Sequence, residues 1–321
     1  MILKNKLLGI SLAVIIMIAA KFLSGYLPTF GTALLALILG VLVRQFLTNF
    51  SPFSSGVSWT EKYVLETAIV FIGFGFEISK FQEIGISTLA VIFGSIILII
   101  LLALLLQKFI GKEDGKLFWL LGAGSAICGS SAIGATAPLI QAKEEETGIS
   151  LAVINLLGLL GMVLLPIIAV GLSFSNLETG IFLGGILQSV GHVVGSAFAI
   201  NPEVGQFATV VKMGRVAFLV PFLLIVYFLF RNKSDGTKLK FPLFILFFLV
   251  AVLISQIGIF NSETVKFLSK SGDTLLNIGM AAIGLKINIK SLWKISGKAF
   301  LVGLIIFAVQ ILIYVVYLLL N

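Results

Sequence analysis

A lysine and an arginine three positions apart interrupt an otherwise apolar stretch of the chain. Lys212 and Arg215 project from one face of the helix predicted over 204–230. Charged side chains at such a depth are costly, and they usually line a cavity or a pathway. The guanidinium fork and the ammonium point charge together suit a tetrahedral oxyanion. In the alternative interpretation, both side chains reach a nearby interface or pair with Glu66 or Glu203.

A second candidate site lies in residues 122–138, which have the length of a membrane span but consist almost entirely of small residues. Glycines and hydroxyls weaken a helix here, and open backbone in lipid requires cover from protein or a water-filled cavity. In transporters, half-helix ends at such interruptions point at the substrate. Freed N–H groups around residues 128–131 would add anion-binding donors. We therefore place substrate contacts at Ser125, Cys128, Gly129, Ser130 and Ser131; the alternative is a small-residue helix packed tightly against its neighbours.

Two polar residues in other predicted spans could serve such a site. Glu66 lies in the span 63–79, where a buried glutamate could titrate and couple proton movement to transport. Its alternative role is a salt bridge to one of the two buried basic residues. Asn155, in the span 148–171, is a candidate partner for the opened backbone or for an interhelical hydrogen bond.

The only histidine of the chain, His192, lies four residues after Gln188, so the two share a face of the helix predicted over 177–200. We place Gln188 among the substrate ligands and His192 as a proton relay near neutral pH. The alternative for His192 is a hydrogen-bonded packing role. A nucleophile–base pair of His192 with Cys128 lacks an orienting acid, so we expect no enzyme activity.

The composition defines an integral membrane protein. The chain is 59% hydrophobic and 11% charged, with a mean hydropathy of +1.16. The net charge of +8 arises from basic residues in loops, which indicates membrane topology and not nucleic-acid binding. One cysteine and one histidine exclude a disulfide framework and leave no metal site, and we expect no cofactor.

The expected fold is an all-α polytopic membrane domain over residues 1–321 with about eleven transmembrane helices. The predicted spans are 7–24, 30–47, 63–79, 86–107, 117–140, 148–171, 177–200, 204–230, 241–260, 271–287 and 298–320. With the N-terminus in the cytoplasm and the C-terminus outside, most of the 22 Lys and Arg residues fall on the cytoplasmic side.

An internal repeat relates distant parts of the chain. Residues 72–78 (IGFGFEI), which end the third predicted span, resemble residues 282–287 (AIGLKI), which end the tenth. The offset of seven spans is odd, so the two copies run through the membrane in opposite directions. This is typical of the inverted repeats of secondary transporters, and it predicts halves at 30–171 and 177–320.

Three motifs resemble one family of bacterial membrane proteins. They are residues 124–133 (GSAICGSSAI) followed by Pro138, residues 207–216 (FATVVKMGRV) followed by Pro221, and residues 280–285 (MAAIGL). Together they are similar to the YeiH-type family proposed to be sulfate exporters, which is related in fold to cation/proton antiporters and bile-acid symporters.

In one motif the chain departs from that family. Where the family usually carries a histidine and an acid, this chain has Gln188 and Ser189, and His192 stands where a glutamine is usual. A mechanism that requires the histidine–acid pair is therefore not expected to apply unchanged to this chain.

The resemblance implies a secondary transporter with interrupted helices that exports a small sulfur oxyanion, of the sulfate, sulfite or sulfonate class, by alternating access. The alternative is a cation/proton antiporter of the same fold class. The expected partners are the anionic substrate, H⁺ or Na⁺ as a coupling ion, membrane lipids and a second copy in a homo-oligomer. The expected location is the bacterial inner (cell) membrane.

Overall fold

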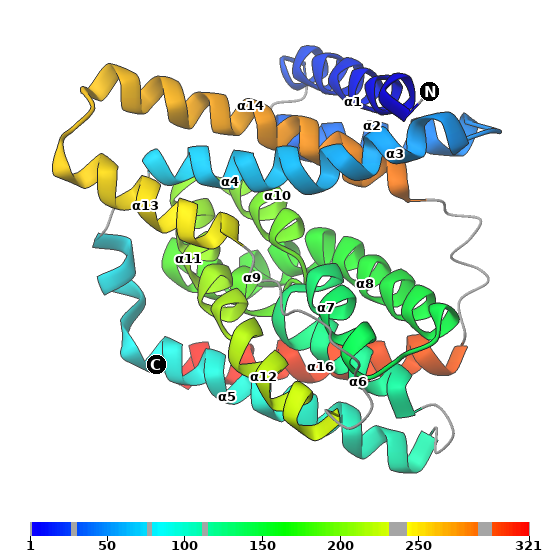
Figure 1. Ribbon diagram of the computed structural model, residues 1–321. Helices are drawn as coiled ribbons and strands as arrows, with labels where there is room; N and C mark the ends of the chain where they lie inside the picture. Colours follow the sequence, from blue (N-terminus) through cyan, green and yellow to red (C-terminus); the bar gives the residue numbers. More distant parts are fainter. Residues whose placement is uncertain are drawn as a thin grey trace. The chain divides into compact units, whose positions relative to one another are not determined.

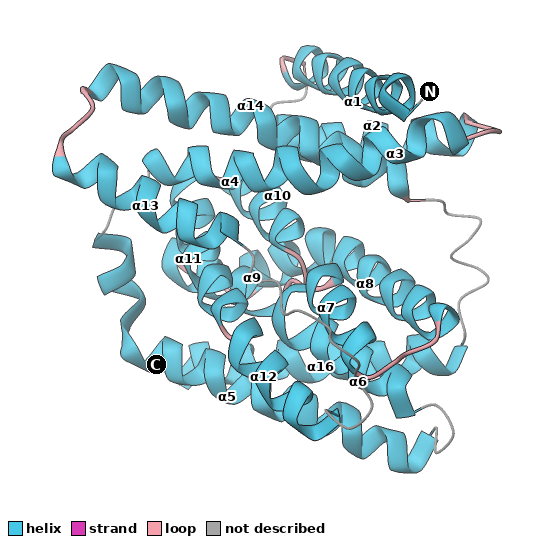
Figure 2. Ribbon diagram, in the orientation of Figure 1, coloured by secondary structure: helices cyan, strands magenta, loops and turns pink. Residues whose placement is uncertain are grey.

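Helices make up the protein. The computed structural model describes residues 2–26, 31–75, 79–110, 115–230, 243–287 and 297–320, and no strand occurs in these ranges (Figure 2). The all-helical prediction is therefore confirmed for them. The described helices divide into two compact units, and each unit draws on the early and the late parts of the chain. The units thus do not coincide with the two halves predicted as an inverted repeat, which stays a prediction.

The first unit is built from the N-terminal helices and from two helices late in the chain. It contains α1 (Ile2–Ser24), α2 (Gly31–Phe46), α3 (Ser51–Trp59), η2 (Thr60–Val64), α4 (Leu65–Phe74), α13 (Leu243–Ile257) and α14 (Ser262–Lys286). The long helix α14 packs against α2 and α4, while α1 packs against α2 and α3 (Figure 1).

Close helix packing in this unit depends on glycine. A Cβ on Gly40 of α2 would lie 2.5 Å from the carbonyl oxygen of Ala281 in α14. A Cβ on Gly284 of α14 would lie 2.2 Å from the carbonyl oxygen of Leu37 in α2. Without an aqueous driving force between apolar helices, close backbone approach of this kind is what holds such a pair together.

The second unit contains the segments predicted to carry the site. Its helices are α5 (Ser79–Ile110), α6 (Gly115–Ala123), η3 (Gly124–Cys128), α7 (Ser130–Leu139), α8 (Glu144–Gly171), α9 (Asn176–Ile186), α10 (Val190–Ile200), α11 (Pro202–Ala217), α12 (Leu219–Phe230) and α16 (Gly297–Leu320). Within this unit α8 packs against α6, α7 and α9, and α16 packs against α8 and α9. Hydroxyl pairs join α5 to α16, with Ser95 Oγ 3.2 Å from Tyr314 Oη and Thr88 Oγ1 2.9 Å from Tyr317 Oη.

Capping residues fix where several of these helices begin. The backbone N–H of Lys143 donates to Glu146 Oε2 at 2.7 Å at the start of α8. The backbone N–H of Ser175 donates to Glu178 Oε2 at 2.7 Å, and Ser175 Oγ accepts from the Glu178 N–H, at the start of α9. Only the second is a full capping box, because the Lys143 side chain has no acceptor; at both starts a glutamate side chain accepts from the N-cap N–H.

Among the residues that the structure describes, five helices are long and apolar enough to cross a membrane: Lys6–Ser24, Glu83–Ile110, Glu144–Gly171, Pro202–Phe230 and Gly297–Leu320. Shorter apolar helices cover Leu35–Phe46, Gly115–Cys128, Val190–Ile200 and Leu246–Ile257. Every predicted span overlaps a helix. The spans 117–140 and 177–200 are interrupted near their middle, and Phe218 alone separates α11 from α12 in the span 204–230. A multi-pass membrane protein is therefore supported, while the count of eleven spans stays a prediction.

Candidate functional site: a crossing of two interrupted helices

The small-residue segment is interrupted at Gly129, as its composition predicts. The helix α6 widens into the π-helical turn η3, where the N–H of Gly129 donates to the carbonyl of Gly124 at 2.9 Å, five residues back. Gly129 then has φ 65° and ψ −123°, a conformation that residues with a side chain rarely adopt. After it the chain restarts as α7 at Ser130. The interruption leaves a carbonyl end on one side and an N–H end on the other.

A second interruption separates α9 from α10. Leu187 turns extended at φ −57° and ψ 136°, and α10 restarts at Val190. Ser189 caps the new helix, because its Oγ accepts from the N–H of His192 at 3.1 Å. The prediction that Gln188 and His192 share one helix face is therefore wrong, since Gln188 lies in the break and only His192 lies in α10.

The two interruptions touch each other. A Cβ placed on Gly129 would lie 3.5 Å from both the carbonyl carbon and the carbonyl oxygen of Gln188. Two carbonyl ends and two N–H ends of half-helices therefore meet at one point, which we call the crossing. It is defined by Gly129 with the neighbouring end of η3 and start of α7, and by Gln188 with the neighbouring end of α9 and start of α10.

Lys212 donates hydrogen bonds to the open backbone carbonyls of both interruptions. Its side chain is fully buried. The ammonium donates to the carbonyl of Ile127 at 2.8 Å, of Leu187 at 2.8 Å and of Gln188 at 2.7 Å. Three acceptors require all three ammonium protons, so the geometry describes a charged lysine with no donor to spare.

Arg215 does the same one helical turn further along α11, and it is also fully buried. Nε and Nη2 donate to the carbonyl of Ala126 at 3.0 and 2.9 Å, and Nη2 donates to that of Ser125 at 2.6 Å. Nη1 donates to the carbonyls of Gly184, Gly185 and Leu187 at 3.2, 2.6 and 3.0 Å. The guanidinium thus bonds the ends of η3 and α9 together.

These contacts decide between the roles expected for the two basic residues. Lys212 and Arg215 do not extend to an interface, because neither is exposed. Their hydrogen bonds go to backbone carbonyls of the same unit, and not to Glu66 or Glu203. Cations at helix C-termini oppose the negative end of the helix dipole and satisfy the last carbonyls. In this conformation they act as helix caps.

Helix α8 lines one side of the crossing. Ser130 Oγ lies 3.4 Å from Asn155 Oδ1, which is the longest hydrogen bond of the site. One turn on, a Cβ at Gly158 would lie only 2.2 Å from the imidazole of His192, so the ring packs directly on the backbone of α8. Asn155 thus bonds a hydroxyl of the opened segment and not its backbone, which corresponds to the interhelical alternative, and His192 occupies a packed position.

Helix α16 contributes a residue that the sequence analysis missed. Gln310 is 1% exposed, and its Nε2 donates to the carbonyl of Ser125 in η3 at 3.0 Å. The available signal was a carboxamide in the middle of an apolar span, because polar groups at that depth are expensive and need partners.

Several buried polar atoms of this unit have no partner among the described residues. They are Ser125 Oγ, Thr136 Oγ1, both amide atoms of Gln188, His192 Nδ1 and Gln310 Oε1. Native interiors leave few such atoms unless a water or a ligand satisfies them. Gln188 stands out, because it is fully buried and has both a donor and an acceptor free.

The remaining predicted residues fall in different places. Cys128 is buried at the start of the break, with its thiol in hydrogen-bonding reach of the Ser131 hydroxyl and the Ala132 N–H. Ser131 itself is exposed, which makes the start of α7 the accessible edge of the crossing. Glu66 is half-buried in α4 and belongs to the first unit. The crossing is defined by residues of the second unit, so Glu66 is not among them.

The interior of the crossing carries positive charge without acidic side chains. In the described part of the second unit the acidic residues lie at or near helix starts: Glu83 in α5, Glu144–Glu146 in α8, Glu178 in α9 and Glu203 in α11. No His/Cys/Asp/Glu group of three or more that could hold a metal ion occurs among the described residues. What the crossing offers a ligand is N–H ends, hydroxyls and a carboxamide beside two cations.

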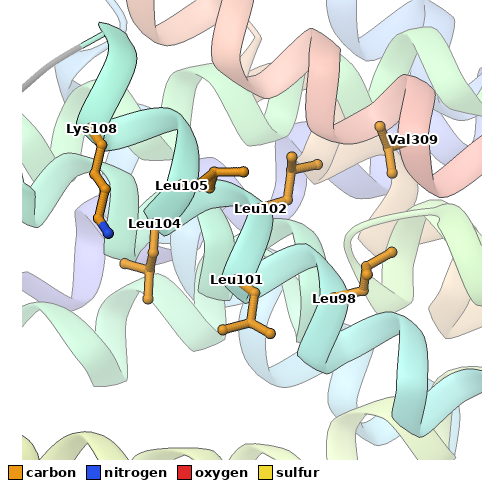
Figure 3. Close-up of a pocket in the computed structure, with 7 residues that line it drawn as sticks. All are labelled: Leu98, Leu101, Leu102, Leu104, Leu105, Lys108 and Val309. Atoms are coloured by element: carbon orange, nitrogen blue, oxygen red, sulfur yellow. The ribbon is translucent and has the colours of Figure 1, made fainter.

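A groove elsewhere on the same unit has a different character. It encloses about 480 Å³ and is lined by Leu98, Leu101, Leu102, Leu104, Leu105, Lys108 and Val309 (Figure 3). It shares no residue with the crossing, and its lining is aliphatic apart from Lys108. Apolar side chains of this kind suit contact with lipid.

These features define a class of protein. It is a multi-pass helical membrane protein in which two broken helices cross and buried basic side chains cap their backbone carbonyls. The chain belongs to the family described as conserved hypothetical protein 698, whose model matches residues 8–303. This agrees with the resemblance to YeiH-type proteins.

Relatives of similar length occur in streptococci. The chain is 33% identical over 320 residues to a UPF0324 membrane protein of Streptococcus agalactiae, covering 94% of each chain. It is 34% identical over 312 residues to a UPF0324 membrane protein of Streptococcus pneumoniae, covering 92% of each. No solved structure matches this chain.

Proposed function

We propose that the protein is a secondary transporter that carries a small sulfur oxyanion across the cell membrane by alternating access at the crossing. One observation carries this proposal: the fully buried cations Lys212 and Arg215 lie at the point where two half-helices begin. Interrupted helices whose ends meet in this way are the usual binding sites of secondary transporters.

The charges of the crossing favour an anion. Each helix end acts as about half an elementary charge, so the two carbonyl ends and the two N–H ends offset one another. The charges of Lys212 and Arg215 then remain as an excess of about two positive charges, since no acidic side chain of the described second unit lies inside the crossing. An incoming oxyanion would reduce this excess.

The substrate would bind the N–H ends and not the two cations. Every ammonium proton of Lys212 is engaged by carbonyls, and the guanidinium of Arg215 makes six hydrogen bonds of the same kind. The first N–H groups of α7 and α10 have no acceptor within their own helices. We therefore assign the ligand contacts to Gly129, Ser130, Ser131 and Gln188, and the long-range attraction to Lys212 and Arg215. Ser125 and Cys128 are assigned to the walls.

The alternative, a cation/proton antiporter, would use a buried carboxylate at the crossing. The sequence predicted this role for Glu66, which is half-buried and lies in the first unit. Asn155 and His192 are the remaining polar groups proposed for coupling, and H⁺ and Na⁺ stay open as coupling ions. We further propose that the protein is not an enzyme, since the Cys128 thiol contacts Ser131 and Ala132 while His192 packs on Gly158.

Flux in proteoliposomes tests the proposal. The purified chain is reconstituted with sulfate, sulfite or a sulfonate inside, and a potassium gradient with valinomycin sets the membrane potential. A negative interior should accelerate anion efflux, because each charge moved across 100 mV changes the driving force by about 2.3 kcal/mol. Saturable, voltage-sensitive efflux supports the oxyanion carrier. Proton movement driven by Na⁺ or K⁺ without any anion requirement would favour the antiporter instead.

The membrane orientation is tested separately. We propose a cytoplasmic N-terminus and an external C-terminus in the bacterial inner membrane. Reporter fusions that are active only inside or only outside the cell, placed after residue 321 and before residue 1, should report opposite sides.

A further inference from the structure

The free carboxamide of Gln188 has consequences for which anion the crossing accepts. The side chain is fully buried, and neither Nε2 nor Oε1 has a partner among the described residues. Its backbone carbonyl is held by Lys212 at 2.7 Å, so the backbone of the residue is held at the break. A buried amide with both ends unsatisfied is the kind of group that a ligand completes.

Gln188 lies beside the two N-terminal helix ends that we assign to the anion. It lies two residues before α10 begins and beside Gly129, which immediately precedes α7. Residue 188 therefore lies next to the N-terminal ends of two helices, and these ends supply only donors. Gln188 Oε1 is a buried acceptor without a donor in reach among the described residues; Gln310 Oε1 of α16 is a second such acceptor, and the variants below distinguish the two.

We infer that the crossing selects an oxyanion that carries a hydrogen-bond donor of its own, such as a hydroxy- or amino-sulfonate or hydrogen sulfite. This inference rests on the proposed function and names the substrate class of the same site. The helix N-termini and Gln188 Nε2 bind the oxygens of the anion, and Gln188 Oε1 accepts its O–H or N–H. A fully deprotonated sulfate has acceptors only, so it leaves the buried Oε1 unsatisfied.

The charged and titratable groups around this amide do not replace the missing donor. Lys212 and Arg215 of α11 are engaged by carbonyls. Cys128 of η3 is engaged with the start of α7, and Tyr314 of α16 pairs with Ser95. His192 of α10 presents its ring to Gly158 of α8.

A matched pair of substrates tests the inference. 2-Hydroxyethanesulfonate and ethanesulfonate have the same charge and nearly the same size, and they differ by one hydroxyl. We expect wild-type protein in proteoliposomes to prefer the hydroxylated anion in kcat/KM by about 5- to 100-fold, because this is what an unsatisfied buried acceptor costs. Sites built to bond a substrate hydroxyl discriminate in this way.

Three variants complete the experiment. Gln188→Met should bring the ratio close to one, whereas Gln188→Glu keeps the acceptor and should keep the preference while weakening both anions. Gln310→Met is the matched control, since it removes another buried carboxamide of the same unit; it should leave the ratio unchanged whatever its effect on rate. Thermal unfolding in detergent checks that each variant is folded.

The outcomes separate the two proposals. A wild-type ratio near one, or a ratio that survives Gln188→Met, overturns the inference while transport itself stands. If neither sulfonate nor sulfate is moved by wild-type protein, the proposed function fails, and the substrate assignment fails with it. The kcat/KM ratio of the two sulfonates in wild-type protein can overturn the inference by itself. The test therefore does not depend on every variant folding.

Discussion

Replacing Lys212 by methionine separates the role of a helix cap from that of a substrate ligand. The methionine side chain has a similar length and keeps the apolar stem, but it has no proton to donate. Lys212 now serves the carbonyls of Ile127, Leu187 and Gln188. In the variant the Leu187 carbonyl still accepts from Arg215 at 3.0 Å, so two buried carbonyls lose the contact described for them.

The size of the effect follows from those two carbonyls. A buried group left without its partner costs roughly 1–3 kcal/mol, so the loss is about 2–6 kcal/mol. Removing a charge from the interior recovers part of this, because burying an ion is itself expensive. We expect a net loss of about 2 kcal/mol or more, which lowers the apparent unfolding temperature by at least about 3 °C.

The assay compares thermal unfolding in detergent with transport in proteoliposomes. Lys266→Met, a substitution at an exposed lysine of α14, is the control and should change stability by less than about 0.5 kcal/mol. If Lys212 is a cap, Lys212→Met loses stability and the maximal transport rate together. A variant as stable as wild type, with only a raised KM for the anion, would refute the capping role and restore Lys212 as a direct ligand.

Three further predictions concern the packing around the crossing. Gly129→Ala should cost about 1–3 kcal/mol because of its positive φ. Gly134→Ala, inside α7 and with nothing within 4 Å of the added Cβ, should leave the unfolding temperature unchanged or raise it slightly; a loss equal to that of Gly129→Ala would contradict the assigned break. Gly158→Ala places a methyl group against the His192 ring and should lower the free energy of unfolding by about 1–3 kcal/mol. The double variant with His192→Ala should recover most of this loss in the same unfolding assay. Gln310→Leu removes one neutral donor from the opened helix and should cost about 1 kcal/mol; a loss as large as that of Lys212→Met would mean that α16, and not α11, holds the break.

The sequence predicted the first interruption because its cause is local. Small residues and hydroxyls over 122–138 weaken a helix wherever they occur, and the break falls at Gly129 among them. The second interruption has a weaker local signal, since Leu187 and its neighbours also fit a continuous span. It depends on the cations of α11, which are distant in sequence and which stabilise the open carbonyls there.

The roles of the site residues were harder to predict than their positions. The three-residue spacing of Lys212 and Arg215 correctly places them on one side of α11, but spacing says nothing of what they face. Their targets are backbone carbonyls, and every residue has one, so no residue type marks them. Gln310 was missed for a related reason: its partner is also a carbonyl, and it belongs to a span that follows the crossing by more than a hundred residues.

The capping of both breaks from α11 also sets an order of events during synthesis. The ribosome makes the interrupted helices, residues 115–139 and 176–200, before the first residue of α11. Until Lys212 and Arg215 emerge, the open carbonyls of η3 and α9 lack the donors that later satisfy them, and hydrocarbon offers no replacement. The nascent chain must therefore keep these segments in contact with water or with the insertion machinery until α11 arrives. A chain truncated before residue 202 should accordingly be degraded, although it contains both broken helices in full.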